Sequence, residues 1–192
     1  MQEVLSARFV ERFQQSPLLV FAPGRINLIG EHTDYNLGYV MPAAIHLGIQ
    51  FAMGPTEDGS VFMEALDLGE TYEGHLQELQ PAEQGWANYL LGICAQLKQA
   101  GKALSGFRVM LGGNIPVGSG LSSSAALECG FLFGLNELFG LGLGRMEMAK
   151  IAQAAEHSKY VGVQCGIMDQ FASLFGQSGQ VVQLDCRSME YA

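Results

Sequence analysis

The chain has 192 residues, enough for one large domain, and its 48% of hydrophobic residues can bury a substantial core, which excludes a disordered protein. The net charge of −9, with only ten Lys and Arg residues, argues against nucleic acid as a partner, because binding phosphates requires clustered cations. No apolar run is long enough to span a bilayer, so we expect no membrane partner and a cytoplasmic location. The pattern specifies no oligomeric state.

The cysteines are widely spaced and form no CxxC pair. They are Cys94, Cys129, Cys165 and Cys186. Without a ligand set of zinc-like spacing, this pattern favours free thiols in a reducing compartment over disulfides or a structural metal.

The first part of the chain predicts a helix followed by strands. Leu5, Phe9 and Phe13 recur every four residues, which is typical of an amphipathic helix and not of a signal peptide. A short buried strand follows at 18–22, and then a turn-rich stretch extends to residue 40. Two further runs, 45–53 and 60–66, have the composition of strands.

The second part predicts mostly helices. A helix is expected at 86–99, where Gly101 is placed to end it, then a strand at 106–113 and a loop at 114–120. The later predicted elements are a helix buried on nearly every side at 121–139, helices at 145–157 and 167–176, and a strand at 180–185. Strands and helices do not alternate regularly, so the fold class is α+β, with a mixed sheet and packed helices.

Glycines and serines are concentrated at 112–126, GGNIPVGSGLSSSAA, between a predicted strand and a predicted helix. Glycines let the backbone approach an anion, and a helix N-terminus presents unpaired N–H groups to it. The alternative is a glycine-rich turn before a serine-capped helix. No P-loop sequence is present. The segment PVGSGLSSSAA, however, resembles the ATP-binding motif of the GHMP family of small-molecule kinases. The resemblance assigns nucleotide contacts to Gly118, Ser119, Gly120, Leu121, Ser122, Ser123 and Ser124.

Charged side chains gather at 22–36, APGRINLIGEHTDYN. Carboxylates and an imidazole this close together can satisfy the adjacent hydroxyls of a sugar in a fixed pattern, although an exposed charged turn is the simpler alternative. The whole segment is very similar to the signature of galactokinases. That resemblance implies that Glu31, His32 and Asp34 contact galactose, and we include the intervening Thr33 in the substrate-binding set.

The segment 156–176 contains the candidate catalytic base. Asp169 is predicted at the start of a short helix, where it could accept a proton from a sugar hydroxyl or only cap the helix. A nearby cation, for which Arg25 is the candidate, would help to neutralise the transferred phosphoryl group. The string CGIMDQF resembles the galactokinase pattern around the catalytic aspartate, which favours catalytic roles for Asp169 and Arg25.

Glu156 lies near the end of a predicted helix, where a negative charge is unfavourable unless it binds a cation. In GHMP kinases a glutamate and a serine of the nucleotide motif share Mg²⁺, and the resemblance maps these ligands to Glu156 and Ser124. The chain has one residue more between Glu156 and Asp169 than galactokinases usually have, so the position of Glu156 follows less directly than that of Asp169.

The three resemblances occur in the expected order and cover residues 22–176. They imply that 1–192 is the N-terminal GHMP-kinase-like part of an enzyme that phosphorylates the anomeric hydroxyl of galactose with ATP and Mg²⁺. Because the chain ends just after a predicted strand, we expect the C-terminal domain of the family to be absent and the activity of the chain alone to be in question. Alternatives are a kinase for N-acetylgalactosamine or another small alcohol, and a non-catalytic sensor of galactose and ATP. The intact Ser124-Ala125 step argues against the sensor.

Overall fold

The computed structural model describes residues 1–116 and 118–192; Val117, within the expected phosphate loop, lies outside the described residues. Its elements follow in chain order. They are α1 (Gln2–Phe13), β1 (Leu18–Asn27), β2 (Tyr39–Val40), β3 (Pro42–Thr56), β4 (Ser60–Ala65), β5 (Glu70–His75), the 3₁₀ turn η1 (Leu76–Glu78), α2 (Gly85–Gln99), β6 (Gly106–Gly113), α3 (Ser123–Phe139), α4 (Arg145–His157), α5 (Met168–Phe175) and β7 (Leu184–Asp185).

Five strands form a mixed sheet in the order β1-β3-β6-β4-β5. All neighbouring pairs are antiparallel except β4 and β6, which run parallel. The parallel pair is joined through α2, as a parallel connection requires a crossover. A second, two-stranded sheet pairs β2 with β7 and brings the chain end beside the turn-rich segment after β1. The α+β fold class is confirmed.

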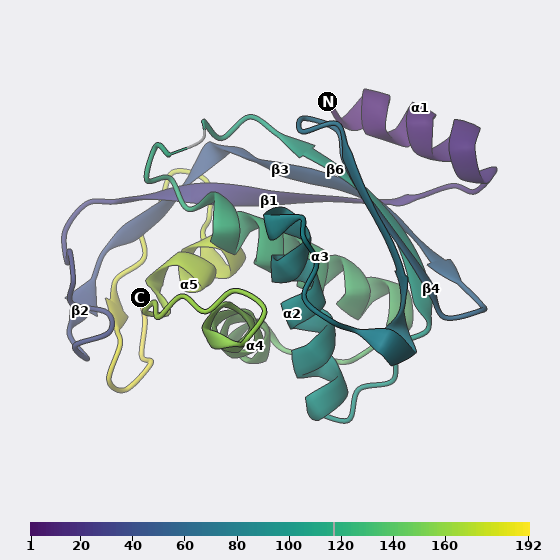
Figure 1. Ribbon diagram of the computed structural model, residues 1–192. Coiled ribbons are helices and arrows are strands. Elements are labelled where there is room, and N and C mark those ends of the chain that lie inside the picture. Colours follow the sequence, from purple (N-terminus) through teal and green to yellow (C-terminus); the bar gives the residue numbers. More distant parts are fainter. Residues whose placement is uncertain (117) are drawn as a thin grey trace.

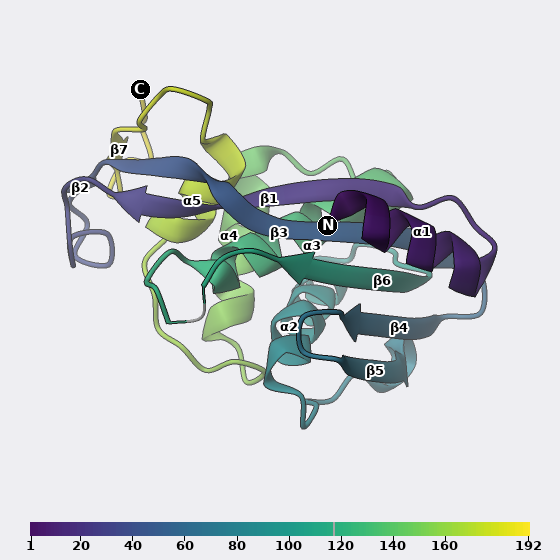
Figure 2. The same ribbon diagram turned by 90° about the horizontal axis from the view of Figure 1, so that it is seen from above.

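Helices cover both faces of the large sheet, but unequally (Figures 1 and 2). Helices α2 to α5 pack below it in the view of Figure 1. Helices α2, α3 and α4 enclose the main core, and α5 packs mostly in a second cluster with β2 and β7. Helix α1 lies alone on the opposite face. There Leu5 and Phe9 are fully buried against Ala52 of β3 and Met110 of β6. The apolar stripe predicted for the first helix therefore packs on the sheet.

The expected helices agree with the structure within a few residues, and α3 is buried on nearly all sides as predicted. The strands agree less well. β1 and β3 are longer than expected, β5 was not expected at all, and the strand predicted at 180–185 is limited to Leu184–Asp185. The four cysteines are free thiols, as expected. Within the described part of the chain, no helix combines the length and the hydropathy needed to cross a bilayer.

Candidate active site

Arg25 lies on β1 where the pairing of this strand with β3 changes register. The pairing runs to Pro23 and resumes at Arg25, with Gly24 between them. A Cβ atom at position 24 would lie 2.6 Å from the carbonyl oxygen of Leu121, so this close approach requires glycine. The backbone N–H of Arg25 donates to the same carbonyl at 3.1 Å. The strand that carries Arg25 is therefore attached directly to the loop before α3.

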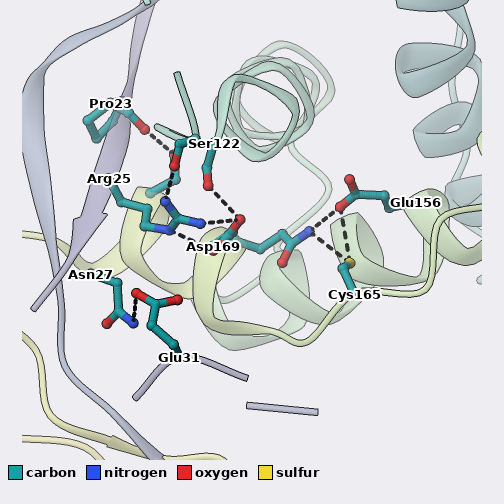
Figure 3. Close-up of polar contacts among 11 residues, drawn as sticks. Pro23, Arg25, Asn27, Glu31, Ser122, Glu156, Cys165 and Asp169 are labelled. Atoms are coloured by element: carbon teal, nitrogen blue, oxygen red, sulfur yellow. Dashed lines mark hydrogen bonds and ion pairs between the residues drawn. The ribbon is translucent and has the colours of Figure 1, made fainter. Parts of the chain in front are cut away.

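Asp169 is the second residue of α5, and its carboxylate accepts hydrogen bonds from two distant segments (Figure 3). The Arg25 guanidinium donates from Nε to Oδ1 at 2.7 Å and from Nη2 to Oδ2 at 2.9 Å. The Ser122 hydroxyl also donates to Oδ2. The N-cap position of α5 belongs to Ile167, so the carboxylate of Asp169 does not cap the helix. The two candidate catalytic residues thus form a bidentate ion pair.

A cleft of about 270 Å³ opens next to this ion pair. Arg25 and Asp169 line one side, and the Arg25 Nη1 atom donates to the carbonyl of Gly120 at 2.6 Å. The residues of the expected nucleotide motif line the rest. They are Gly118, Ser119, Gly120, Leu121, Ser122, Ser123 and Ser124, together with Pro116. Because α3 begins at Ser123, its first N–H groups lack intrahelical partners and can bind an anion in the cleft.

The expected sugar-binding residues lie in the turn that follows β1. Glu31 accepts a hydrogen bond from the Asn27 amide at 2.9 Å, and Figure 3 shows this pair on the same side of the strand as Arg25. His32 has a left-handed backbone, with φ of 62°, and its Nδ1 bonds to the Tyr35 hydroxyl. The Thr33 hydroxyl bonds to the carbonyls of Gly30 and Tyr39, so it holds the turn together.

Asp34, the last residue of this set, packs against the segment before α5. A Cβ atom at Gly166 would come within 1.8 Å of the Asp34 carboxylate, so only glycine permits this contact. Asp34 also lines a larger cavity of about 740 Å³, together with His157 and Cys165. The sugar signature and the segment 156–176 therefore meet, although they are far apart in the sequence.

Ser124 and Glu156, the expected Mg²⁺ ligands, lie differently in the structure. Ser124 lines the cleft, whereas Glu156 is only 6% exposed on α4 and does not line it. Its Oε2 accepts hydrogen bonds from Gln170 Nε2 at 2.7 Å and from Cys165 Sγ at 3.1 Å. Within the described residues, its other oxygen, Oε1, accepts no hydrogen bond.

The donor set fits a hard cation, which prefers oxygen ligands such as a hydroxyl and a carboxylate. Ser124 lies one helical turn before Glu128, so both share a face of α3. Burial raises the pKa of Glu128, and the charge of Glu156 on α4 raises it further. No cluster of three or more His, Cys, Asp or Glu residues with metal-binding geometry occurs among the described residues. Ser124 and Glu156 do not form such a cluster, and their role as Mg²⁺ ligands stays a prediction.

Two polar residues near this site were not among the predictions. Glu128 and Gln170 are both 0% exposed. For Glu128 the signal is a single carboxyl group in an otherwise apolar run, AALECGFLF, because burying it without a partner is costly. The run around Gln170, IMDQFASLF, also contains Asp169 and Ser173, so it gives no such signal.

Comparison with known families gives two matches. Residues 88–177 match the model of the GHMP kinases N terminal domain, and residues 7–55 match the galactokinase galactose-binding signature. The second match contains the turn with Glu31, His32, Thr33 and Asp34, and the first contains the loop before α3 and Asp169.

Similar proteins agree with these matches. A galactokinase of Roseiflexus sp. is 41% identical over 186 residues, which cover 94% of this chain and 47% of that protein. A galactokinase of Thermococcus kodakarensis is 42% identical over 172 residues, covering 90% of this chain and 48% of that protein. The chain thus spans about half the length of the curated relatives it matches.

Solved structures share the fold. The crystal structure of Lactococcus lactis galactokinase complexed with galactose has a TM-score of 0.91 and 40% identity, covering 99% of this chain and 50% of that one. The mevalonate kinase of Methanococcus jannaschii has a TM-score of 0.74 at 19% identity over 93% of this chain and 56% of that one, a likeness of fold alone.

Proposed function

The chain belongs to the GHMP kinase family and carries the galactokinase signature, and from this premise we propose that the protein transfers the γ-phosphoryl group of ATP to the anomeric hydroxyl of galactose. The observation that carries the proposal is the ion pair of Arg25 and Asp169 at the edge of a cleft lined by the loop before α3. A candidate base, a cation and an anion-binding helix terminus lie together there. Phosphoryl transfer requires that combination, since its catalysis is mostly positioning and charge stabilisation.

In the proposed reaction, the bond from the anomeric oxygen to phosphorus forms as the bond from phosphorus to ADP breaks. Asp169 accepts the proton of the attacking hydroxyl. Arg25, already bonded to Asp169, offsets the negative charge of the transferred group. The backbone N–H groups at the start of α3 hold the phosphates. Ser124 and Glu156 would hold Mg²⁺, which when bound neutralises charge on the phosphate oxygens.

We assign recognition of the sugar to Glu31, His32, Thr33 and Asp34. Two of these side chains, Glu31 and His32, are exposed and offer a carboxylate and an imidazole to the sugar hydroxyls. Selection against an epimer follows because, once a bound sugar covers these side chains, a hydroxyl in the wrong orientation leaves a polar group unpaired. The hydroxyl of Thr33 contributes by holding the turn that presents its neighbours.

We also propose a cytoplasmic location. The four cysteines are free, and Cys94 and Cys129 are fully buried as thiols. Unpaired cysteines in this number are typical of a reducing compartment.

The test is to incubate the purified protein with ATP, Mg²⁺ and either galactose or glucose, which differ at the C4 hydroxyl, and to follow products by ³¹P NMR. We expect galactose 1-phosphate and ADP, with selectivity over glucose of at least about 10²-fold. Equal rates on both sugars would refute the assignment of sugar recognition to residues 31–34. Binding of galactose and ATP without phosphoryl transfer would instead favour the alternative of a non-catalytic sensor.

A further inference from the structure

Two buried polar groups behind the cleft lack hydrogen-bond partners. Glu128 on α3 is 0% exposed, and among the described residues neither of its carboxyl oxygens has a partner. Gln170 on α5 is also 0% exposed, and its Oε1 is unpartnered within the same part of the chain. Unpartnered polar groups at this depth are rare in folded proteins and call for a physical explanation.

The orientation of the Gln170 amide follows from its other contact. Its Nε2 donates to Glu156 Oε2 at 2.7 Å, and a carboxylate there can only accept. Cys165 donates its S–H to the same oxygen, as the dashed lines at Glu156 in Figure 3 show. The amide nitrogen therefore faces Glu156, and the amide oxygen is the atom that still needs a donor.

Glu128 can supply this donor if its carboxyl group carries a proton. As a carboxylate it would offer only acceptors to another acceptor, and both groups would stay unpaired. As a carboxylic acid it can donate to Gln170 Oε1, so that one proton gives both Glu128 and Gln170 Oε1 a hydrogen-bond partner. Helices α3 and α5 meet at this point, since the Cys129 thiol, next to Glu128 on α3, donates to the backbone carbonyl of Gln170 at 3.7 Å.

We propose that Glu128 and Gln170 are positioning residues for Glu156: a neutral Glu128 carboxyl donates to the Gln170 amide oxygen, and the amide nitrogen holds the Glu156 carboxylate in place. The proposal rests on the proposed function, in which Glu156 binds the cation of the nucleotide. It also connects the cation ligand to the candidate base, because Gln170 follows Asp169 on α5.

The surroundings favour the neutral form of Glu128. Burial, and secondly the charge of Glu156 on α4, raise the pKa of Glu128 to about 9, and the Gln170 amide opposes this only in part. Burial raises the pKa of Cys165, and the nearby Glu156 carboxylate raises it further, so this thiol remains a donor. From α2, Tyr89 faces the same group, and burial raises its pKa, with Glu156 and Glu128 adding to the effect. No cation is among these neighbours within the described residues.

Substitutions at Glu128 of α3 and Gln170 of α5 test the proposal in the purified chain. Glu128→Leu and Gln170→Leu remove the hydrogen-bonding groups, whereas Glu128→Gln keeps a neutral donor of similar shape. Glu137→Leu, at an exposed position of the same helix, is the matched control. The readouts are affinity for Mn²⁺ in the presence of ATP, measured by electron paramagnetic resonance, and the infrared C=O band of a protonated carboxyl group.

We expect both leucine variants to weaken Mn²⁺ binding by about 10–100-fold, as is typical when a partner of a metal ligand is removed. Glu128→Gln should bind Mn²⁺ almost as the wild type does, and the protonated-carboxyl band should disappear in this variant but remain in Glu137→Leu.

Loss of Mn²⁺ affinity in Glu128→Gln equal to that in Glu128→Leu would overturn the proposal, because Glu128 would then be needed as a charged ligand. Absence of the infrared band from the wild type would overturn it as well. A wild-type chain that binds no Mn²⁺ in the presence of ATP would refute the proposed function, and the positioning role with it. The infrared band of the protonated carboxyl group would still decide whether Glu128 is neutral.

Discussion

The carboxylate of Asp169 has three donors, two nitrogens of Arg25 and the hydroxyl of Ser122. The ion pair is largely screened from water, with side-chain exposures of 14% for Arg25 and 27% for Asp169. Charge-assisted, bidentate bonds of this kind are stronger than neutral ones and fix both orientation and position. A change that preserves the shape of Asp169 but removes its charge therefore separates a chemical role from a structural one.

We predict that Asp169→Asn lowers kcat by about 10²–10⁴-fold, because the amide cannot accept the hydroxyl proton. The affinity for ATP should change little, since the loop before α3 keeps its own contacts. Helix α5 should persist, because its N-cap position belongs to Ile167. Steady-state kinetics and thermal melts on the same preparation measure both effects. Asp58→Asn, in the turn between β3 and β4, serves as the control. A folded variant with normal kcat would leave Asp169 without a catalytic role.

A second prediction concerns how the free energy of unfolding depends on pH through Glu128. The measurement is made in the presence of a metal chelator and without nucleotide. The pKa of Glu128 rises from its ordinary value of 4.5 to about 9 in the folded chain. Between these values the unfolded chain loses a proton that the folded chain keeps, so the free energy of unfolding falls as pH increases. Below pH 4.5 both states are protonated and this contribution is fully present. Glu128→Gln should flatten the decline between pH 5 and 9, measured by urea unfolding. An unchanged slope would mean that Glu128 is ionised in the folded protein.

At the scale of elements, the site depends on how β1 is attached to the loop before α3. The contact between Gly24 and the Leu121 carbonyl, together with the bond from the Arg25 N–H, sets the distance between strand and loop. Arg25 adds a side-chain bond to Gly120. The register of β1 changes at this point, and the side chain of Arg25 reaches Asp169 on α5. A methyl group at position 24 would therefore disturb the site without changing any polar side chain.

We predict that Gly24→Ala destabilises the chain by about 1–3 kcal/mol, the usual effect of overpacking, and lowers activity further by displacing Arg25. Gly85→Ala at the start of α2 is the control, because a Cβ atom there meets nothing within 4 Å. Urea unfolding measures the loss of stability, and initial rates measure the loss of activity. Wild-type stability in Gly24→Ala would show that loop and strand move apart freely.

At the scale of the whole chain, the sheet separates a structural face from a functional one. Figure 1 shows α1 alone on one face and α2 to α5 on the other. Asp169 belongs to α5, and Arg25 belongs to β1, a strand that these four helices cover. Phe9 of α1 is fully buried and contacts Phe13 with a ring separation of 4.8 Å. The first helix packs on the sheet, and none of its residues is among the described residues that line the cleft.

We therefore predict that Phe9→Ala lowers the free energy of unfolding by about 3–5 kcal/mol but leaves the affinity of the folded fraction for ATP unchanged. Val4→Ala, on the exposed side of α1, should have little effect on either quantity, because Val4 is 58% exposed. Denaturant unfolding and calorimetry make the comparison. A large loss of nucleotide affinity in Phe9→Ala at low temperature would contradict the separation of the two faces.

Local patterns in the sequence account for most of the helices. The four-residue recurrence of Leu5, Phe9 and Phe13 and the stop at Gly101 are properties of neighbours along the chain, and helices are stabilised by such neighbours. Strand ends and strand β5 were missed, because residues such as those of Glu70–His75 become a strand only by pairing with β4. The α+β class followed from the irregular order of elements, but the order β1-β3-β6-β4-β5 did not.

The sequence by itself determined the three motifs, and through them the family, because each motif is a run of neighbouring residues whose chemistry can be read directly. Only the tertiary structure decided that Arg25 and Asp169 form an ion pair and that the Ser122 hydroxyl donates to Asp169. It also decided that Glu156 accepts a hydrogen bond from the Gln170 amide. Arg25 and Asp169 are 144 positions apart. The contact between them forms only when three segments pack together, namely β1, α5 and the loop before α3. Local propensity contains no information about such a distance, because it depends on the packing of every element between them.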